Sequence, residues 1–328
     1  MSFPIGRKLY FKAILAVIFL SAQAGLALAQ SQKKGDASVR VEYQYIRTGS
    51  FLSGSEEFDY WTTDTQVAVL SGDYALNESW TVFAALPYVS KRFNSEVPWG
   101  GDPHNPNDPY WVDFVPPDKR FWDDGKYHSA FQDFSIGVSY RIQKGPLTLS
   151  PYIHYGVPAS NYPFFAKAAI GKNLWTVPVG TSFSYVPYFS DWHFGGNVSY
   201  VFSQKPLGVN VNYWLADLSA GYWFKANLSV EAFLSLKYAP GGLSLLSPEF
   251  INGDPAGAVY PNDWDTEKWW QHDRLVGNRN LNFGVVIDYF FSREWKVSGS
   301  AYQSVWTEES NEVDFAFTLG FTRFFGSD

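Results

Sequence analysis

The sequence predicts an all-β chain that forms a transmembrane antiparallel β-barrel of about 12 strands with long extracellular loops. Three observations predict this fold class. Aromatic residues make up 19% of the chain and charged residues only 17%, fewer than soluble domains usually carry. Beyond residue 30, no run approaches the ~18 apolar residues of a membrane-spanning helix. Several segments also alternate, with a period of two, between bulky apolar and small or polar residues.

The last segment of the chain shows this alternation most clearly. One face carries Val313, Phe315, Phe317, Leu319 and Phe321, and the other carries Asp314, Ala316, Thr318, Gly320 and Thr322. The same split recurs over residues 39–45, 133–142, 228–238 and 281–289. Successive side chains of a strand point to opposite sides. We therefore expect the apolar faces to contact lipid and the polar faces to line a lumen.

A soluble β-sandwich also alternates, so the choice of a barrel depends on further features. The alternating segments reach the ~9–11 residues that cross a bilayer, whereas strands of soluble sheets usually have ~5–6. Aromatic residues stand near the segment ends, where amphipathic rings favour the membrane–water boundary. These pairs are Trp80 and Tyr88, Trp214 and Tyr222, and Trp295 and Trp306.

The connections between segments are of two kinds. Tight turns are expected at Asn77-Glu78, Lys144-Gly145, Phe189-Ser190, Lys225-Ala226 and Arg293-Glu294. Longer links lie between them, and those over residues 94–127 and 241–278 are very long. Short turns at one end and long loops at the other are typical of outer-membrane barrels.

Two features of the sequence do not fit the simple pattern. Pro87 and Pro178 fall inside expected strands, where proline lacks a donor for the ladder, so each requires a bulge or a rim position. The segment over residues 66–74 alternates poorly.

The first 29 residues resemble an export signal. Arg7, Lys8 and Lys12 form a basic start, residues 13–20 form an apolar core, and Ala27-Leu28-Ala29 is a cleavage site of the A-x-A type. We expect residues 30–328 to be a single barrel domain in the outer membrane of a Gram-negative cell. The chain is acidic, with 32 Asp and Glu against 25 Lys and Arg, which argues against a nucleic-acid partner. It contains no cysteine.

Parts of the sequence resemble the outer-membrane family named for the meta-pathway of phenol degradation. Residues 67–89, VAVLSGDYALNESWTVFAALPYV, resemble its strand–turn–strand signature ending in "L-P-Y". FQDFSIGVSYRI from Phe131 resembles its "G-D…G-x-x-Y-R" strand, with Gln132 where glycine is usual. LTLSPYIHYGVPASNYP from Leu147 resembles its "P-x-G-x-Y" segment. The resemblance spans about residues 67–202 and implies a barrel and a transport role. It implies no catalytic residues.

The charged residues on the polar faces are the candidates for lining the lumen and setting selectivity. A barrel of about 12 strands lies between filled barrels and open porins, so inward side chains would decide what passes. The candidates are Arg40, Glu42, Asp133, Arg141, Asp217, Glu231, Lys237, Asp288, Lys296 and Asp314. The alternative is that these charges pair with one another and only hold the wall together.

The two very long links carry tryptophans among Gly, Pro, Asn and Asp. Candidates for capturing a solute are Trp99, Trp111, Trp122, Trp264, Trp269 and Trp270. The alternatives are ordinary turn chemistry and a Ca²⁺ site formed by loop oxygens.

We expect a channel that passes small, hydrophobic or aromatic solutes by passive diffusion, with no cofactor, no metal and no catalysis. The expected partners are outer-membrane lipid, a small-molecule solute and the assembly machinery. Phe325 has the parity of a C-terminal assembly signal, but Arg323 interrupts the series. Two alternatives remain: a structural or adhesive barrel with a closed lumen, and an outer-membrane hydrolase using His154 or His193 with a serine. No nucleophile-elbow or H-E-x-x-H motif is present.

Overall fold

The computed structural model describes residues 33–53, 56–58, 62–94, 125–162, 164, 167–248, 251–253, 259–261 and 271–326. The predicted signal peptide lies outside these residues. So do the tryptophans proposed for solute capture, Trp99, Trp111, Trp122, Trp264, Trp269 and Trp270.

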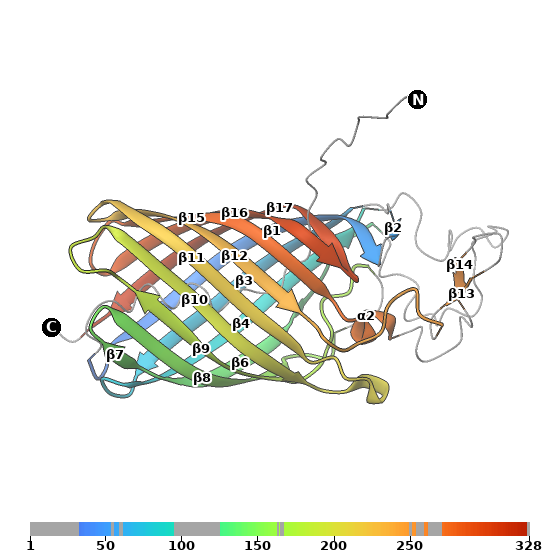
Figure 1. Ribbon diagram of the computed structural model, residues 1–328, viewed down its shortest axis with the longest axis horizontal. Coiled ribbons are helices and arrows are strands. Elements are labelled where there is room, and N and C mark those ends of the chain that lie inside the picture. The colour runs from blue at the N-terminus through green and yellow to red at the C-terminus, as the bar shows by residue number, and fades with distance from the viewer. Residues whose placement is uncertain are drawn as a thin grey trace, which may run out of the picture.

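The described residues form a closed antiparallel barrel of 12 strands, which confirms the predicted fold class and strand number (Figure 1). One of the 12 crossings is divided into the three short strands β5, β6 and β7, so the wall consists of 14 elements. These are β1 (Ala37–Ser53), β3 (Thr63–Ala75), β4 (Trp80–Phe93), β5 (His128–Phe131), β6 (Asp133–Tyr140), β7 (Ile142–Lys144), β8 (Leu147–Pro158), β9 (Thr176–Tyr185), β10 (Trp192–Ser203), β11 (Tyr213–Lys225), β12 (Leu228–Tyr238), β15 (Arg279–Phe290), β16 (Trp295–Glu308) and β17 (Ser310–Phe325).

Pairing between the first and last strands closes the barrel. The register runs from Ala37 opposite Phe325 to Leu52 opposite Ser310. Short elements outside the wall are β2 (Glu56–Phe58), which pairs with the end of β1, the hairpin of β13 (Ile251–Gly253) and β14 (Val259–Pro261), and α2 (His272–Leu275). No helix in the described part of the chain is long and apolar enough to span a membrane.

The connections differ between the two ends of the barrel. All five predicted tight turns join neighbouring strands, and they lie at the end where β1 begins and β17 finishes (Figure 1). We call this the short-turn end. At the opposite end, residues 159–175 link β8 to β9, and residues 239–278 link β12 to β15.

The outer surface carries the predicted apolar faces. Val41 is 54% exposed, Leu218 58% and Ile287 50%, although each lies within a strand of the wall. Aromatic rings cluster on this surface toward both ends of the barrel. Trp80 and Tyr140 pack with ring centroids 4.9 Å apart near the short-turn end, and Tyr200 and Trp214 do so, also at 4.9 Å, toward the other end. This is the girdle arrangement of membrane barrels.

Arg323 lies within the girdle at the short-turn end. Its guanidinium lies 5.2 Å from the ring centroid of Trp295 and 4.8 Å from that of Phe325. Cation–π contacts of this kind allow an arginine to occupy an outward position at the membrane boundary. The charge of Arg323 therefore interrupts the apolar series at the level of an aromatic girdle, where neighbouring rings stabilise it.

The poor alternation of residues 66–74 has a structural cause. Val67 and Val69 face inward but are 2% and 6% exposed, because they belong to an apolar cluster inside the barrel. That cluster also contains Tyr162 and Ile170, from the link between β8 and β9. Around residues 67–70, strand β3 is therefore apolar on its inner face, which packs against a folded-in segment, as well as on its outer face.

Pro87 and Pro178 lie inside strands, as the sequence indicated. Pro87 pairs with Val69 on one side, and on the other its carbonyl accepts from the amide of Gln132, which separates β5 from β6. The register of β4 slips by one residue there, so a bulge absorbs Pro87. Pro178 pairs with Val201, and the ladder toward β8 is interrupted beside it.

Candidate functional site: the lumen

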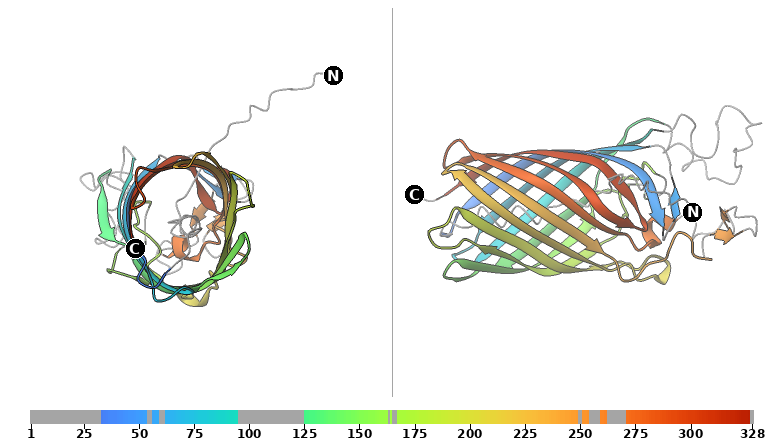
Figure 2. Two further views of the ribbon diagram at one scale, coloured as in Figure 1. Left: turned by 90° about the vertical axis from the view of Figure 1, so that its left-hand side faces the viewer. Right: turned by 45° about the horizontal axis from the view of Figure 1, so that its top comes forward.

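A cavity of about 1670 Å³ occupies the inside of the barrel. At the short-turn end its walls include Lys33, Arg293 and Glu294, so it reaches the rim there. At the other end, Ile170 and Lys172 form part of its boundary. Seen along the barrel, α2 lies within the outline of the ring (Figure 2).

Residues 167–174 and 271–278 lie at the end of the cavity opposite the short turns, and we call them together the cap. Hydrogen bonds to backbone carbonyls hold the cap to the wall. Lys91 Nζ lies 3.2 Å from the oxygen of Ala169, and Gln132 Nε2 lies 3.0 Å from that of Ile170. The hydroxyl of Tyr162 also donates to the Asp133 carboxylate on β6.

Further contacts join the two parts of the cap to each other. The Arg274 guanidinium donates to the carbonyl of Asn173 at 3.0 Å and lies 4.0 Å from the ring centroid of Phe164. Lys172 Nζ donates to the carbonyl of Val276 at 3.3 Å. Leu275 is fully buried. The alternation of the strands does not predict this cap. The only sequence feature that could have indicated it is the run of small and apolar residues over 168–170, which is typical of a buried segment.

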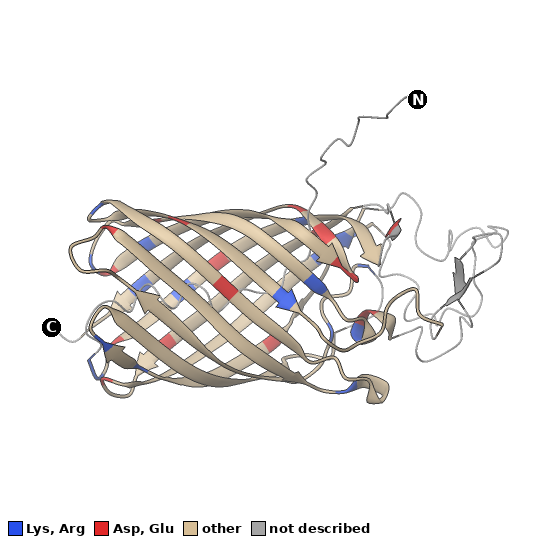
Figure 3. Cartoon of the chain, viewed as in Figure 1, with Lys and Arg blue, Asp and Glu red and all other residues tan. Residues whose placement is uncertain are grey.

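Most of the predicted lumen charges occupy inward positions and are paired within the wall. Figure 3 shows positively and negatively charged residues scattered along the wall of the barrel. Arg40 Nη2 lies 2.5 Å from Glu42 Oε1, and Lys296 Nζ lies 3.3 Å from Asp288 Oδ2. The side chains of this second pair are only 3% and 9% exposed. These pairs fit the alternative in which the charges stabilise the wall.

Two more inward carboxylates have neutral or histidine partners. Asp217 accepts from Ser235 Oγ at 2.6 Å and from Asn197 Nδ2 at 3.4 Å. Glu231 Oε2 lies 3.3 Å from His193 Nε2. Groups on the two adjacent strands therefore hold Asp217, whereas Glu231 lies beside a histidine of the next strand but one.

The contact between His193 and Glu231 crosses an intervening strand. In the register, His193 on β10 stands opposite Gly221 on β11, and Gly221 stands opposite Glu231 on β12. A Cβ on Gly221 would lie 2.1 Å from His193 Nε2. Glycine is required here because the imidazole lies over its backbone.

Replacing Gly221 by alanine is therefore expected to displace His193 and to lower the free energy of unfolding by about 1–3 kcal/mol. Urea unfolding of the protein in lipid vesicles measures the change. Gly299→Ala is the matched control, because a Cβ there meets nothing within 4 Å. Equal stability of the two variants would contradict the close approach as the reason for this glycine.

Three other candidates have different surroundings. Lys237 on β12 is 8% exposed, and its ammonium lies 4.5 Å from the ring centroid of Tyr213. Arg141 lies between β6 and β7, near the short-turn end, and donates to Gln143 Oε1 at 3.1 Å. Asp133 accepts from Tyr162, as described above.

Asp314 does not face the lumen, which corrects the expectation from strict alternation. The pairing passes from Arg47 opposite Phe315 to Thr48 opposite Val313, so Asp314 is the extra residue of a bulge. Val313, expected on the lipid face, turns inward and is fully buried. The Asp314 carboxylate lies 3.1 Å from the position of a Cβ on Gly49, on the side away from the inward-facing Thr48.

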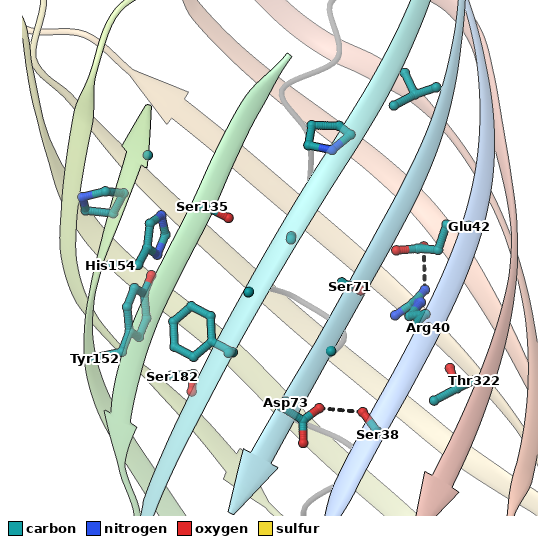
Figure 4. Close-up of a pocket in the computed structure, with 18 of the residues that line it drawn as sticks. Ser38, Arg40, Glu42, Ser71, Asp73, Ser135, Tyr152, His154, Ser182 and Thr322 are labelled. Carbon is teal, nitrogen blue, oxygen red and sulfur yellow. Dashed lines mark hydrogen bonds and ion pairs between the residues drawn. The ribbon is translucent and has the colours of Figure 1, made fainter. Parts of the chain in front are cut away.

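The cavity wall also contains aromatic side chains on positions of the polar parity, which the sequence reasoning did not single out. Tyr152 and His154 stack with ring centroids 5.9 Å apart, and Phe83 lies 5.9 Å from His154 (Figure 4). Near the short-turn end, Phe290 lies 5.9 Å from Trp223 and 6.2 Å from Phe324. All six rings line the cavity.

The two walls of the cavity differ in chemistry. Figure 4 shows Arg40 paired with Glu42, and Ser38 bonded to Asp73, on one side, with the rings of Tyr152 and His154 on the other. Neither His154 nor His193 is hydrogen-bonded to a serine hydroxyl in the described part of the chain. Among the same residues, no three His, Asp or Glu side chains come together as metal ligands would.

Comparison with known proteins identifies the fold but no sequence family. No family model and no curated protein sequence matches the chain. Among solved structures, an outer-membrane channel from Pseudomonas putida F1 is similar, with a TM-score of 0.64 and 14% identity over 90% of this chain and 97% of the other. The CymD monoaromatic hydrocarbon channel has a TM-score of 0.43 and 12% identity, covering 96% and 95% of the two chains. The NanC porin has a TM-score of 0.44 and 12% identity, covering 88% and 100%. The chain thus has the fold of an outer-membrane β-barrel.

Proposed function

We propose that this protein is a passive outer-membrane channel for small, hydrophobic or aromatic solutes. The observation that carries the proposal is the cavity of about 1670 Å³ inside a closed wall. Its boundary includes both the short-turn rim and the cap, so it extends over much of the barrel interior. A barrel of this strand number encloses a narrow space in which lining side chains contact any solute.

The nature of the lining supports the class of solute. Rings of Trp223, Phe290 and Phe324 stand near the rim, and those of Phe83 and Tyr152 lie deeper. Flat aromatic faces bind planar or apolar solutes by stacking and by removing their surface from water. The inward charges of Arg40 and Lys296 are paired with Glu42 and Asp288, which leaves little net charge among these groups.

We also propose that the protein is located in the outer membrane. Outward apolar faces between two aromatic girdles suit a bilayer, and solvent contact for Leu218 or Ile287 would be unfavourable. We include export by a cleaved signal over residues 1–29 and insertion by the outer-membrane assembly machinery. Resemblance to the phenol meta-pathway family agrees with aromatic solutes. Selectivity set by the lumen charges, and capture of solute by the loop tryptophans, also remain proposals.

Single-channel recording in a planar lipid bilayer tests the proposal. We expect small conductance steps from the wild type. Arg274→Ala removes a bond to Asn173 and the contact with Phe164, which together hold the cap closed by about 1–3 kcal/mol. Each 1.4 kcal/mol changes a population about tenfold, so we expect a several-fold higher mean conductance.

Arg47→Ala is the control, because Arg47 lies on the outer surface and donates to Thr62. It removes the same charge without touching the cap. If folded wild type and Arg274→Ala both give no conductance in repeated preparations, the channel proposal is wrong.

The cap specifically favours a second candidate, a structural or adhesive barrel whose lumen stays closed. Ile170, Leu174 and Leu275 are almost completely buried, so the cap packs like a core and not like a loose loop. The recording separates the two candidates, because a permanently closed barrel would give no conductance in either the wild type or Arg274→Ala.

We propose no catalysis. Serine-directed labelling of the folded protein tests the hydrolase alternative.

A further inference from the structure

Two lysines at the capped end of the cavity lack the carboxylate partner that Arg40 and Lys296 have. Lys172 belongs to the cap and Lys237 to β12, and both line the cavity. Lys172 donates to a backbone carbonyl, and Lys237 lies over the ring of Tyr213. Neither forms an ion pair with a carboxylate of the described residues, whereas Arg40 and Lys296 do.

Lys172 and Lys237 line the same end of the cavity, away from the short turns. Burial, and after it the charge of Lys237, lowers the pKa of Lys172 to about 7. The negative charge of Asp273 raises the pKa of Lys172, and the positive charge of Arg274 lowers it. The Asp273 carboxylate is nevertheless 3.5 Å from His272 Nε2 and has a 37% exposed side chain, so it does not neutralise the pair.

Among the described residues, no ion pair joins the Asp133 carboxylate on β6 to either lysine. Asp133 lines the cavity, but its oxygen accepts the hydroxyl of Tyr162. Buried cations without a counter-charge are unfavourable, and a bound anion removes both the repulsion and the desolvation cost. This end of the cavity is therefore complementary to negative charge.

Apolar side chains surround the two lysines. They are nearly completely buried, and they line the same end of the cavity. This set comprises Ile170, Leu174, Val211 and Val276. A ligand that fits must therefore present a charged group to the ammonium groups and an apolar body to these side chains. Inorganic ions satisfy only the first requirement.

We propose that the capped end of the cavity binds an organic carboxylate with an apolar or aromatic body, its carboxylate lying between Lys172 and Lys237. This deepens the proposed channel function and rests on it, since the solute has to enter the cavity. Charge-assisted hydrogen bonds from two lysines to one carboxylate provide the specificity. The channel would then favour aromatic acids over neutral aromatic compounds of the same size.

Isothermal titration calorimetry of the full-length protein in detergent tests the proposal, with benzoate as the probe and benzyl alcohol as its uncharged counterpart. We expect saturable benzoate binding, with benzyl alcohol at least ~10-fold weaker. Lys172→Gln and Lys237→Gln should each weaken benzoate binding ~10-fold. Lys205→Gln removes an equal charge from an exposed position and should leave binding unchanged.

Heat-modifiable gel mobility shows whether each variant folds, and the comparison of the two probes on the wild type needs no variant. Equal affinity for benzoate and benzyl alcohol, or folded lysine variants that bind benzoate normally, would overturn the site. Conductance without selective benzoate binding leaves the channel standing and removes this inference. Benzoate binding in a barrel that never conducts keeps the site and rejects the channel.

Discussion

Replacing Leu218 by arginine should destabilise the folded barrel in lipid by about 2–4 kcal/mol, because the charge would lie near the bilayer midplane. Leu218 is 58% exposed on the outer face of β11 and lies midway between Trp214 and Tyr222 on the same strand. Those two rings belong to the two girdles, so Leu218 stands at the depth where charge is most unfavourable.

Ser219→Arg is the matched control for this substitution. Ser219 is the next residue of β11, and its side chain therefore points into the lumen. We expect this variant to fold with nearly unchanged stability and to alter conductance. Urea unfolding in lipid vesicles measures the first effect and bilayer recording the second. Greater instability of Ser219→Arg than of Leu218→Arg would mean that the assigned inner and outer faces are exchanged.

The Lys296→Met substitution is expected to lower the free energy of unfolding by about 3 kcal/mol or more. Lys296 and Asp288 form a pair whose side chains are 3% and 9% exposed. Without Lys296, the Asp288 carboxylate keeps only the hydroxyl of Ser298, which donates at 2.5 Å. A buried carboxylate without a counter-charge is strongly destabilising.

A double-mutant cycle separates the lost pair from lost packing. Adding Asp288→Leu to Lys296→Met removes the unpaired carboxylate, so we expect most of the stability to return. Unfolding in urea at neutral pH, with all four proteins in the same lipid, gives the coupling energy. If the double variant is as unstable as the sum of the single variants, the pair contributes nothing through charge and the wall is held by packing alone.

Sequence and structure agree best on features that the sequence of a single strand determines, such as which of its side chains face outward. Alternation over residues 228–238 and 281–289 predicted which side chains face lipid, because the two faces of a strand are exposed to different solvents. Tight turns such as Lys225-Ala226 were visible because turn residues interrupt the alternation. The same reasoning failed at Asp314, since a bulge shifts parity without a sign in the local pattern.

The candidate site was predictable only as a list of inward residues. Spacing identified Glu231, Lys237 and Asp288 as residues of the polar face, but partners depend on the register between strands far apart in sequence. The His193 and Glu231 side chains meet over Gly221 because three strands align at that level. Such alignment is a property of the closed wall and not of any single segment.

By itself, the sequence determined that the chain forms a barrel of 12 strands, with lipid-facing and lumen-facing residues assigned by a period of two. Only the tertiary structure decided that the cap lies at one end of the lumen and that Lys172 and Lys237 both line the cavity there. The physical reason is the range of the interactions. Whether a side chain of a strand points outward or inward follows from the surroundings that this one side chain prefers. The cap, in contrast, depends on contacts between segments about a hundred residues apart, such as the hydrogen bond from Lys172 to Val276.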